Sequence, residues 1–293
     1  MFLRMVNDHL STRPHPHEPT DTVDQARTTV VAPRGLTAFL VIAFAFSWTA
    51  WWAGTHLLAG ANPMLVVIAG GFGPMVAAVV VTAATSGWSG VGALFRRYSL
   101  PRRGGIAPYA IAVLVVLAIA ASGAISLHLR GATVDETLLN AALATVPVQF
   151  LLIAVAGGGN EELGWRGFAL PRLQGALPPL AANVVLGAIW AVWHAPLFSM
   201  AGTAQSQVYF PAYALLCVGL TVVLGHVFNA SRGGVLAVVL AHTAVNVVSG
   251  LKATLMGDPA GVTEVALVSL VAVVLVTATR GRLGLGRSGG TGR

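Results

Sequence analysis

The sequence contains a single cysteine, Cys217, in 293 residues. One cysteine excludes a disulfide within the chain and any zinc site built from several thiolates. Charged residues are also scarce: Asp, Glu, Lys and Arg make up 9% of the chain, whereas a soluble domain has roughly a quarter. This is too few to cover a water-soluble globule, so a soluble fold is excluded.

Apolar residues make up 56% of the chain, and the mean hydropathy is +0.77. The formal net charge of +7 does not indicate nucleic-acid binding, because the basic residues lie between apolar runs and form no basic stripe. We therefore expect membrane lipids as neighbours and no nucleic-acid partner.

A hydrocarbon core about 30 Å thick needs about 20 apolar residues in each spanning helix. Segments of this kind predict an all-α, polytopic membrane protein with about eight transmembrane helices. The expected spans are 36–58, 63–85, 107–128, one that begins near 145, 180–199, 208–229, 233–251 and 262–279.

The parts outside the spans are polar. Residues 1–35 predict a disordered cytoplasmic N-terminal tail, 36–280 the membrane domain, and 281–293 a basic cytoplasmic C-terminal tail. With both termini inside, only Arg130 and Lys252 among the basic residues fall in outer loops, which agrees with the positive-inside rule. We expect a multi-pass protein of the cell membrane.

Two acidic residues, Glu161 and Glu162, lie inside or against a predicted span, whereas the others, including Glu264, fall in the tail, in outer loops or at a span edge. A charge at the centre of a membrane helix costs at least about 2.5–3.5 kcal/mol, which suggests a function. Arg166 follows Glu162 by four residues and shares its helix face. We expect this pair to be structural and Glu161 to remain free toward a cavity.

Two further polar strings lie within apolar spans, Trp190-Ala-Val-Trp193-His194 and His242-Thr-Ala-Val-Asn246. Each alone is also typical of a hydrogen bond between packed helices. Together with Glu161 they offer a carboxylate, an imidazole, and an imidazole with an amide. A carboxylate and an imidazole can deprotonate a shared water, and a His–Asn pair can stabilise an oxyanion. This combination favours hydrolysis of an amide.

The three ordered strings, E-E-x-x-x-R, aromatic-x-x-x-H and H-x-x-x-N, resemble the CAAX protease and bacteriocin-processing (CPBP, or Abi) family of intramembrane endopeptidases, which includes the Ras-converting CAAX prenyl protease. The resemblance covers about residues 36–280 and implies an eight-helix intramembrane protease domain. It implies these roles: Glu161 and His194 activate the water, His242 and Asn246 form the oxyanion site, and Glu162 and Arg166 support them. Trp190 stands where the family most often has Phe.

Members of this family have been described both as metalloproteases and as glutamate-dependent proteases. Glu161, His194 and His242 could form a His₂Glu zinc set, but the H-E-x-x-H string is absent. We favour glutamate catalysis without a cofactor and keep zinc as the alternative. The expected partner is a peptide or membrane-protein substrate. The bias to Ala, Gly, Val and Arg is typical of a high-GC bacterium and disfavours prenylated Ras-like substrates.

Two other classes compete with a protease. A proton-coupled transporter would use Glu161 and Glu162 as a relay. A non-catalytic membrane immunity or scaffold protein would use the same polar residues for helix packing alone.

Overall fold

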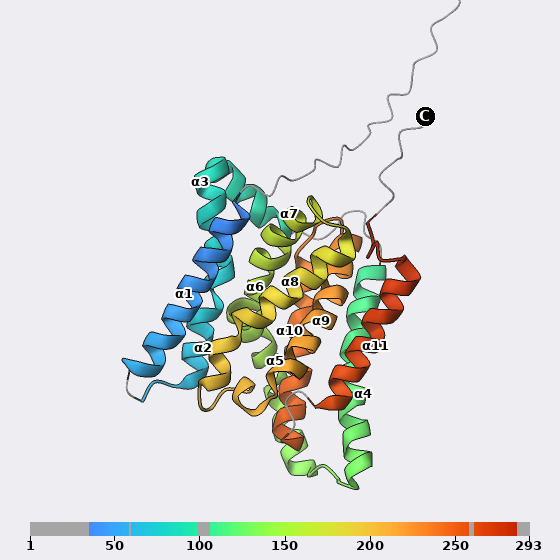
Figure 1. Ribbon diagram of the computed structural model, residues 1–293. Helices are drawn as coiled ribbons and strands as arrows, with labels where there is room; N and C mark the ends of the chain where they lie inside the picture. The colour runs from blue at the N-terminus through green and yellow to red at the C-terminus, as the bar shows by residue number, and fades with distance from the viewer. Residues whose placement is uncertain (1–34, 59, 99–105, 258–260, 286–293) are drawn as a thin grey trace, which may run out of the picture. The chain divides into compact units, whose positions relative to one another are not determined.

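The structure is a computed structural model that describes residues 35–58, 60–98, 106–257 and 261–285. Within these ranges the secondary structure is helical, without β-strands, and eight segments are long and apolar enough to cross a membrane. This confirms the predicted all-α, polytopic fold (Figure 1). Residues 1–34 and 286–293, and with them most of both predicted tails, lie outside the described residues.

The helices follow the predicted spans in order. In chain order they are α1 (Leu36–His56), α2 (Pro63–Gly71), α3 (Gly73–Phe95), η1 (Arg96–Tyr98), α4 (Ala107–Arg130), α5 (Glu136–Ala156), α6 (Gly158–Gly164), the π-helix η2 (Trp165–Ala169), α7 (Leu170–Gln174), α8 (Pro179–Trp193), η3 (Ala195–Ser199), η4 (Gln205–Gln207), α9 (Phe210–Ala230), α10 (Leu236–Met256) and α11 (Val262–Thr279).

The second and fourth spans are interrupted helices. The second consists of α2 and α3, which meet at Phe72, and the fourth runs through α5, α6, η2 and α7. Its predicted start near residue 145 is wrong, because Asp135 caps a helix that begins at Glu136: the Asp135 side chain accepts a hydrogen bond from the Leu138 amide at 3.0 Å. Interrupted membrane helices are tolerated where the protein itself surrounds the break.

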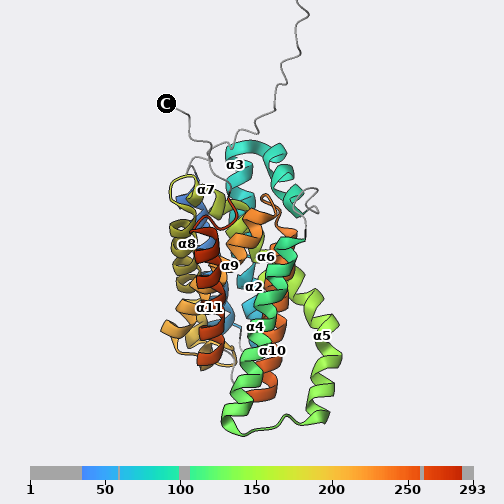
Figure 2. The same cartoon turned by 90° about the vertical axis from the view of Figure 1, so that its right-hand side faces the viewer.

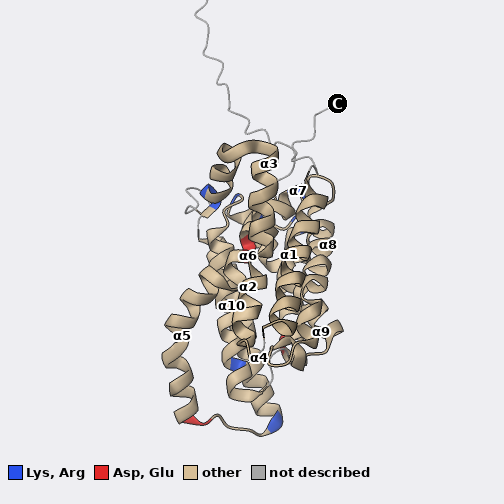
Figure 3. Ribbon diagram, turned by 90° about the vertical axis from the view of Figure 1, so that its left-hand side faces the viewer, with Lys and Arg blue, Asp and Glu red and all other residues tan. Residues whose placement is uncertain are grey.

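The short helix α6 lies in the interior of the assembly, and every residue of α6 and of η2 is buried. It packs against α3 and α10. At Gly164 a Cβ atom would lie 2.4 Å from the Pro74 carbonyl oxygen, so glycine is needed for α6 to approach α3 closely. Figure 3 shows the acidic residues of α6 inside the assembly. The break after α5 therefore places charged residues in the protein core.

Helix α5 is largely exposed, in contrast to α6, since Ala142 is its one buried residue. It contacts α6 and α10, and Figures 2 and 3 show it at the edge of the helical assembly. The chain thus passes from an exposed helix directly into the buried segment that carries Glu161.

A buried ion pair joins α10 to α11. Lys252 and Glu264 are 4% and 1% exposed, and the Lys252 ammonium contacts Glu264 Oε2. Glu264 lies in the first turn of α11, at the edge of its span, as expected, whereas the prediction that put Lys252 in an outer loop is wrong. The reason is that α10 continues past the predicted end at 251 to Met256, where Gly257 terminates it with a left-handed φ of 61°.

We predict that Glu264→Gln lowers the free energy of unfolding by about 3–5 kcal/mol, because it leaves the Lys252 ammonium buried without its carboxylate. Thermal unfolding in detergent measures the effect. The control is Glu136→Gln, which changes an exposed glutamate at the start of α5 and should leave stability unchanged. The double variant Lys252→Met, Glu264→Gln should recover most of the loss. Equal stability of wild type and Glu264→Gln would contradict the prediction.

Candidate functional site

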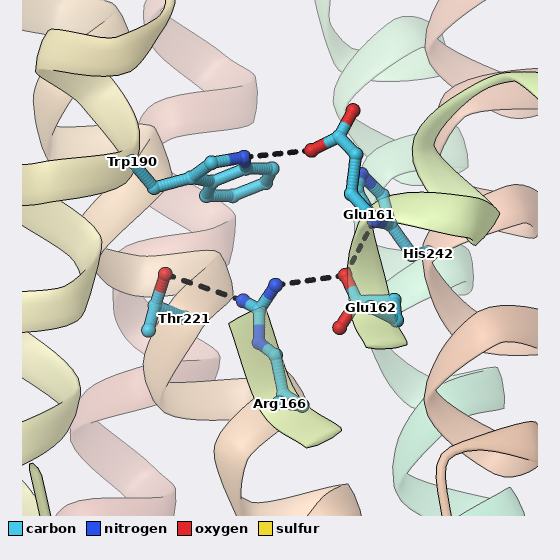
Figure 4. A network of polar contacts seen from close by, with 6 residues as sticks. All are labelled: Glu161, Glu162, Arg166, Trp190, Thr221 and His242. Atoms are coloured by element: carbon cyan, nitrogen blue, oxygen red, sulfur yellow. Dashed lines mark hydrogen bonds and ion pairs between the residues drawn. The ribbon is translucent and has the colours of Figure 1, made fainter. Parts of the chain in front are cut away.

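The structure brings the three polar strings together around α6 (Figure 4). The residues come from four elements: Glu161 and Glu162 from α6, Arg166 from η2, Trp190 and His194 from α8 and its C-terminal end, and His242 and Asn246 from α10. All of them except Asn246 are buried.

Glu162 is the centre of a buried charged network. One carboxylate oxygen, Oε1, lies 2.7 Å from Arg166 Nη1 and 2.6 Å from His242 Nδ1. The Arg166 guanidinium also donates to Thr221 Oγ1 of α9 at 3.3 Å, and it lies over the Trp190 ring, 5.1 Å from the ring centroid. The predicted Glu162–Arg166 pair is therefore present, and it links α6 and η2 to α9 and α10.

The sequence led us to expect a Glu161 side chain without a protein partner, but in the structure it is hydrogen bonded. Its Oε2 accepts a hydrogen bond from Trp190 Nε1 at 2.9 Å. No described residue donates a hydrogen bond to Oε1 of this carboxylate, and the residue is 7% exposed. Glu161 is thus anchored through one oxygen and keeps the other available.

His194 directly follows the last residue of α8, and its ring orientation is set by a local hydrogen bond. Nδ1 lies 2.8 Å from the Trp190 carbonyl oxygen. Because a carbonyl can only accept, Nδ1 carries the proton, and the neutral ring presents a bare Nε2. His194 therefore offers a hydrogen-bond acceptor to the site.

His242 has the same tautomer for a different reason, since its Nδ1 contacts the Glu162 carboxylate. A neutral His242 therefore presents a bare Nε2, and it can donate from this atom only as an imidazolium. The oxyanion role expected for His242 would therefore require the protonated ring. A Cβ atom at Gly158 would lie 2.6 Å from His242 Nε2 and 2.4 Å from Asn246 Nδ2. Both nitrogens therefore face the backbone of Gly158, where only glycine leaves room for them.

Trp190 contacts residues from all three strings. Besides its hydrogen bond to Glu161, its ring packs edge to face against two imidazoles, with ring centroids 5.2 Å apart for His242 and 5.4 Å apart for His194. The aromatic position of the second string thus makes contact with all three titratable candidates.

Two neighbours of the site were not predicted, Thr221 and Tyr213 of α9. Thr221 receives the Arg166 hydrogen bond, and the Tyr213 ring lies 5.4 Å from the His194 ring. Tyr213, Cys217 and Thr221 are spaced by four residues, which puts them on one face of α9. That spacing could have indicated a polar face directed to the site, but a hydroxyl in an apolar span is equally typical of ordinary helix packing.

Among the residues that the structure describes, no three His, Cys, Asp or Glu side chains form a group that could hold a metal ion. As placed, Glu161, His194 and His242 do not form the His₂Glu set considered as the alternative. Both imidazoles donate Nδ1–H to protein acceptors and keep Nε2 without a protein partner among the described residues.

The comparisons with known proteins agree with the motifs. Residues 143–248 match the family model for type II CAAX prenyl endopeptidase, Rce1-like. The chain is also 39% identical over 64 residues to CAAX prenyl protease 2 of Methanococcus maripaludis. That alignment covers 22% of this chain and 23% of the relative, so it spans less than a quarter of the relative's length. The resemblance to this protease family is confirmed for the segment that carries the three strings.

The network predicts effects of very different size on stability for two adjacent glutamates. Glu162→Gln should lower the free energy of unfolding by about 3–5 kcal/mol, because the buried Arg166 guanidinium loses its carboxylate. Glu161→Gln should cost little, since its amide oxygen can still accept from Trp190. Thermal unfolding of both variants in the same detergent compares them. A Glu161→Gln protein less stable than Glu162→Gln would refute this division of roles.

Proposed function

We propose that this protein is an intramembrane endopeptidase that hydrolyses a peptide bond in a peptide or membrane-protein substrate, using a water activated by Glu161 and His194. The observation that carries the proposal is the distribution of open polar atoms. Within the described part of the chain, each residue assigned to the reaction keeps an atom without a protein partner. These atoms are Glu161 Oε1, His194 Nε2, His242 Nε2 and the Asn246 amide.

In the first step, the water gives a proton to Glu161 while its oxygen attacks the carbonyl carbon of the scissile bond. The bare Nε2 of His194 accepts the second hydrogen bond of the water and so orients it. A carboxylate placed in this way contributes about 10²–10⁴-fold as a general base. Trp190 keeps the Glu161 carboxylate in place through Oε2, so that Oε1 remains directed to the water.

In the second step, the carbonyl oxygen becomes an oxyanion that needs hydrogen-bond donors. The Asn246 amide and the Nε2 proton of a His242 imidazolium provide them in a site shielded from bulk water. The Glu162 carboxylate beside Nδ1 stabilises that imidazolium. Gly158 allows both donors to approach one point.

In the third step, the C–N bond breaks and Glu161 returns its proton to the leaving amine nitrogen. One water is consumed and one new carboxyl and one amine are formed. Glu162 and Arg166 take no part in the proton transfers of this proposal: Glu162 Oε1 is held by Arg166 and His242, and Arg166 also donates to Thr221, while Glu162 Oε2 and Arg166 Nε have no hydrogen-bond partner among the described residues. Their contribution is to hold His242 in position.

We predict that Glu161→Gln lowers kcat by about 10²–10⁴-fold, because the amide cannot accept the proton of the water. Cleavage of a fluorogenic peptide library by the purified protein measures this, with Glu136→Gln as the control. Full activity of Glu161→Gln would refute the assignment. Loss of proton or solute flux from proteoliposomes in this variant, without any peptide cleavage by wild type, would favour a transporter.

The same assay tests for a metal. We propose catalysis without a cofactor, so activity should persist after dialysis against a strong chelator. Activity lost to the chelator and restored by zinc would overturn this choice.

We also predict that Gly158→Ala lowers kcat at least about tenfold, because the new methyl group displaces the oxyanion donors. The matched control is Gly250→Ala in α10, where a Cβ atom meets nothing within 4 Å. Both variants should have helix content like that of wild type. Equal activity of the two variants would contradict the placement of His242 and Asn246.

A further inference from the structure

The His194 imidazole is packed between aromatic rings from two helices. Its centroid lies 4.6 Å from that of Trp193 and 5.4 Å from those of Trp190 and Tyr213, each in an edge-to-face arrangement. The two tryptophans belong to α8, whose last residue directly precedes His194. Among the ring contacts of the described residues, Tyr213 is therefore the one that fixes this imidazole relative to α9.

His194 needs such support because it lies just beyond the last residue of α8. Its backbone φ and ψ of −77° and −7° are still in the right-handed helical region, and the chain continues from it as the 3₁₀ turn η3. The Nδ1 hydrogen bond to Trp190 fixes one edge of the ring. A ring held at one edge can still tilt, and the packed ring on its other side limits that motion.

Tyr213 is itself held firmly. Its ring packs edge to face against Phe198, with centroids 5.3 Å apart. Its hydroxyl lies near the side chains of Gln205 and Cys217, which belong to η4 and to the next turn of α9. Because the hydroxyl already has protein neighbours, the part of Tyr213 that acts on His194 is the ring.

We infer that Tyr213 is a positioning residue whose ring holds the His194 imidazole with Nε2 directed to the water. The inference rests on the proposed function, because it assigns a purpose to the orientation of His194. It assigns Tyr213 no direct part in the reaction, so that this residue acts through the imidazole alone.

Steady-state cleavage of the fluorogenic peptide tests this with two substitutions. Tyr213→Leu should lower kcat about tenfold, which corresponds to the loss of the aromatic pair with His194, with KM unchanged. Tyr213→Phe should restore kcat, because it keeps the ring and removes only the hydroxyl. The matched control is Phe210→Leu, which removes a ring that packs on Phe198, away from His194. It should leave kcat unchanged.

Three results would overturn the inference. Tyr213→Leu could retain the kcat of wild type, Tyr213→Phe could be as slow as Tyr213→Leu, or Phe210→Leu could lose as much activity as Tyr213→Leu. The second result would assign the role to the hydroxyl, and the third would mean that general packing of this aromatic cluster is what matters.

A spectroscopic measurement separates this inference from the proposed function. In protein labelled with ¹⁵N-histidine, the His194 signals, assigned by their absence in His194→Asn, should show one tautomer with the proton on Nδ1. Tyr213→Leu should broaden these signals or mix the tautomers, whereas Tyr213→Phe should not. This result is independent of catalysis. If wild type cleaves no peptide, the proposed function fails, but the spectra still decide whether Tyr213 positions His194. Sharp, unchanged His194 signals in Tyr213→Leu would refute the positioning role.

Discussion

The arrangement of the site depends on one carboxylate oxygen, Oε1 of Glu162, which contacts both Arg166 and His242. A buried carboxylate is stable only when it is paired and hydrogen bonded. Here the pairing ties α6 and η2 to α10, and through Thr221 to α9. The same contact fixes the tautomer of His242 and thereby the atom that it presents. Without this interaction, α6 would lose a contact that fixes its position and the His242 ring would lose the contact that orients it.

The interruption of the fourth span makes this contact geometrically possible. A continuous helix from Glu136 would carry its polar residues past the core along one straight axis, whereas the break at Gly157 gives α6 its own start. The glycines on both sides of α6 then permit close approach: Gly164 toward α3, and Gly158 toward the two nitrogens of α10. The glycine-rich segment and the charged residues that follow it therefore act as one structural unit.

Local features of this protein could be predicted from sequence, and contacts between helices could not. The spans follow from hydropathy because the bilayer sets their length, and the Glu162–Arg166 pair follows from a spacing of four on one helix. The Glu161–Trp190 and Lys252–Glu264 contacts join different helices. A sequence indicates which face of a helix is polar, but it does not give the height at which two helices meet. In addition, a hydropathy window ends at the first charge, which is why Lys252 was excluded from its span.

The two imidazoles illustrate how surroundings distinguish residues that look equivalent in sequence. Both commit Nδ1 and present Nε2, but His194 donates to a neutral carbonyl and His242 to a carboxylate. A carboxylate stabilises a positive ring far better than a carbonyl does. His242 is therefore suited to act as an imidazolium donor toward an oxyanion, and His194 to remain a neutral acceptor for a water. The assignment of roles that we propose follows from this difference in partners, since the residue types alone are the same.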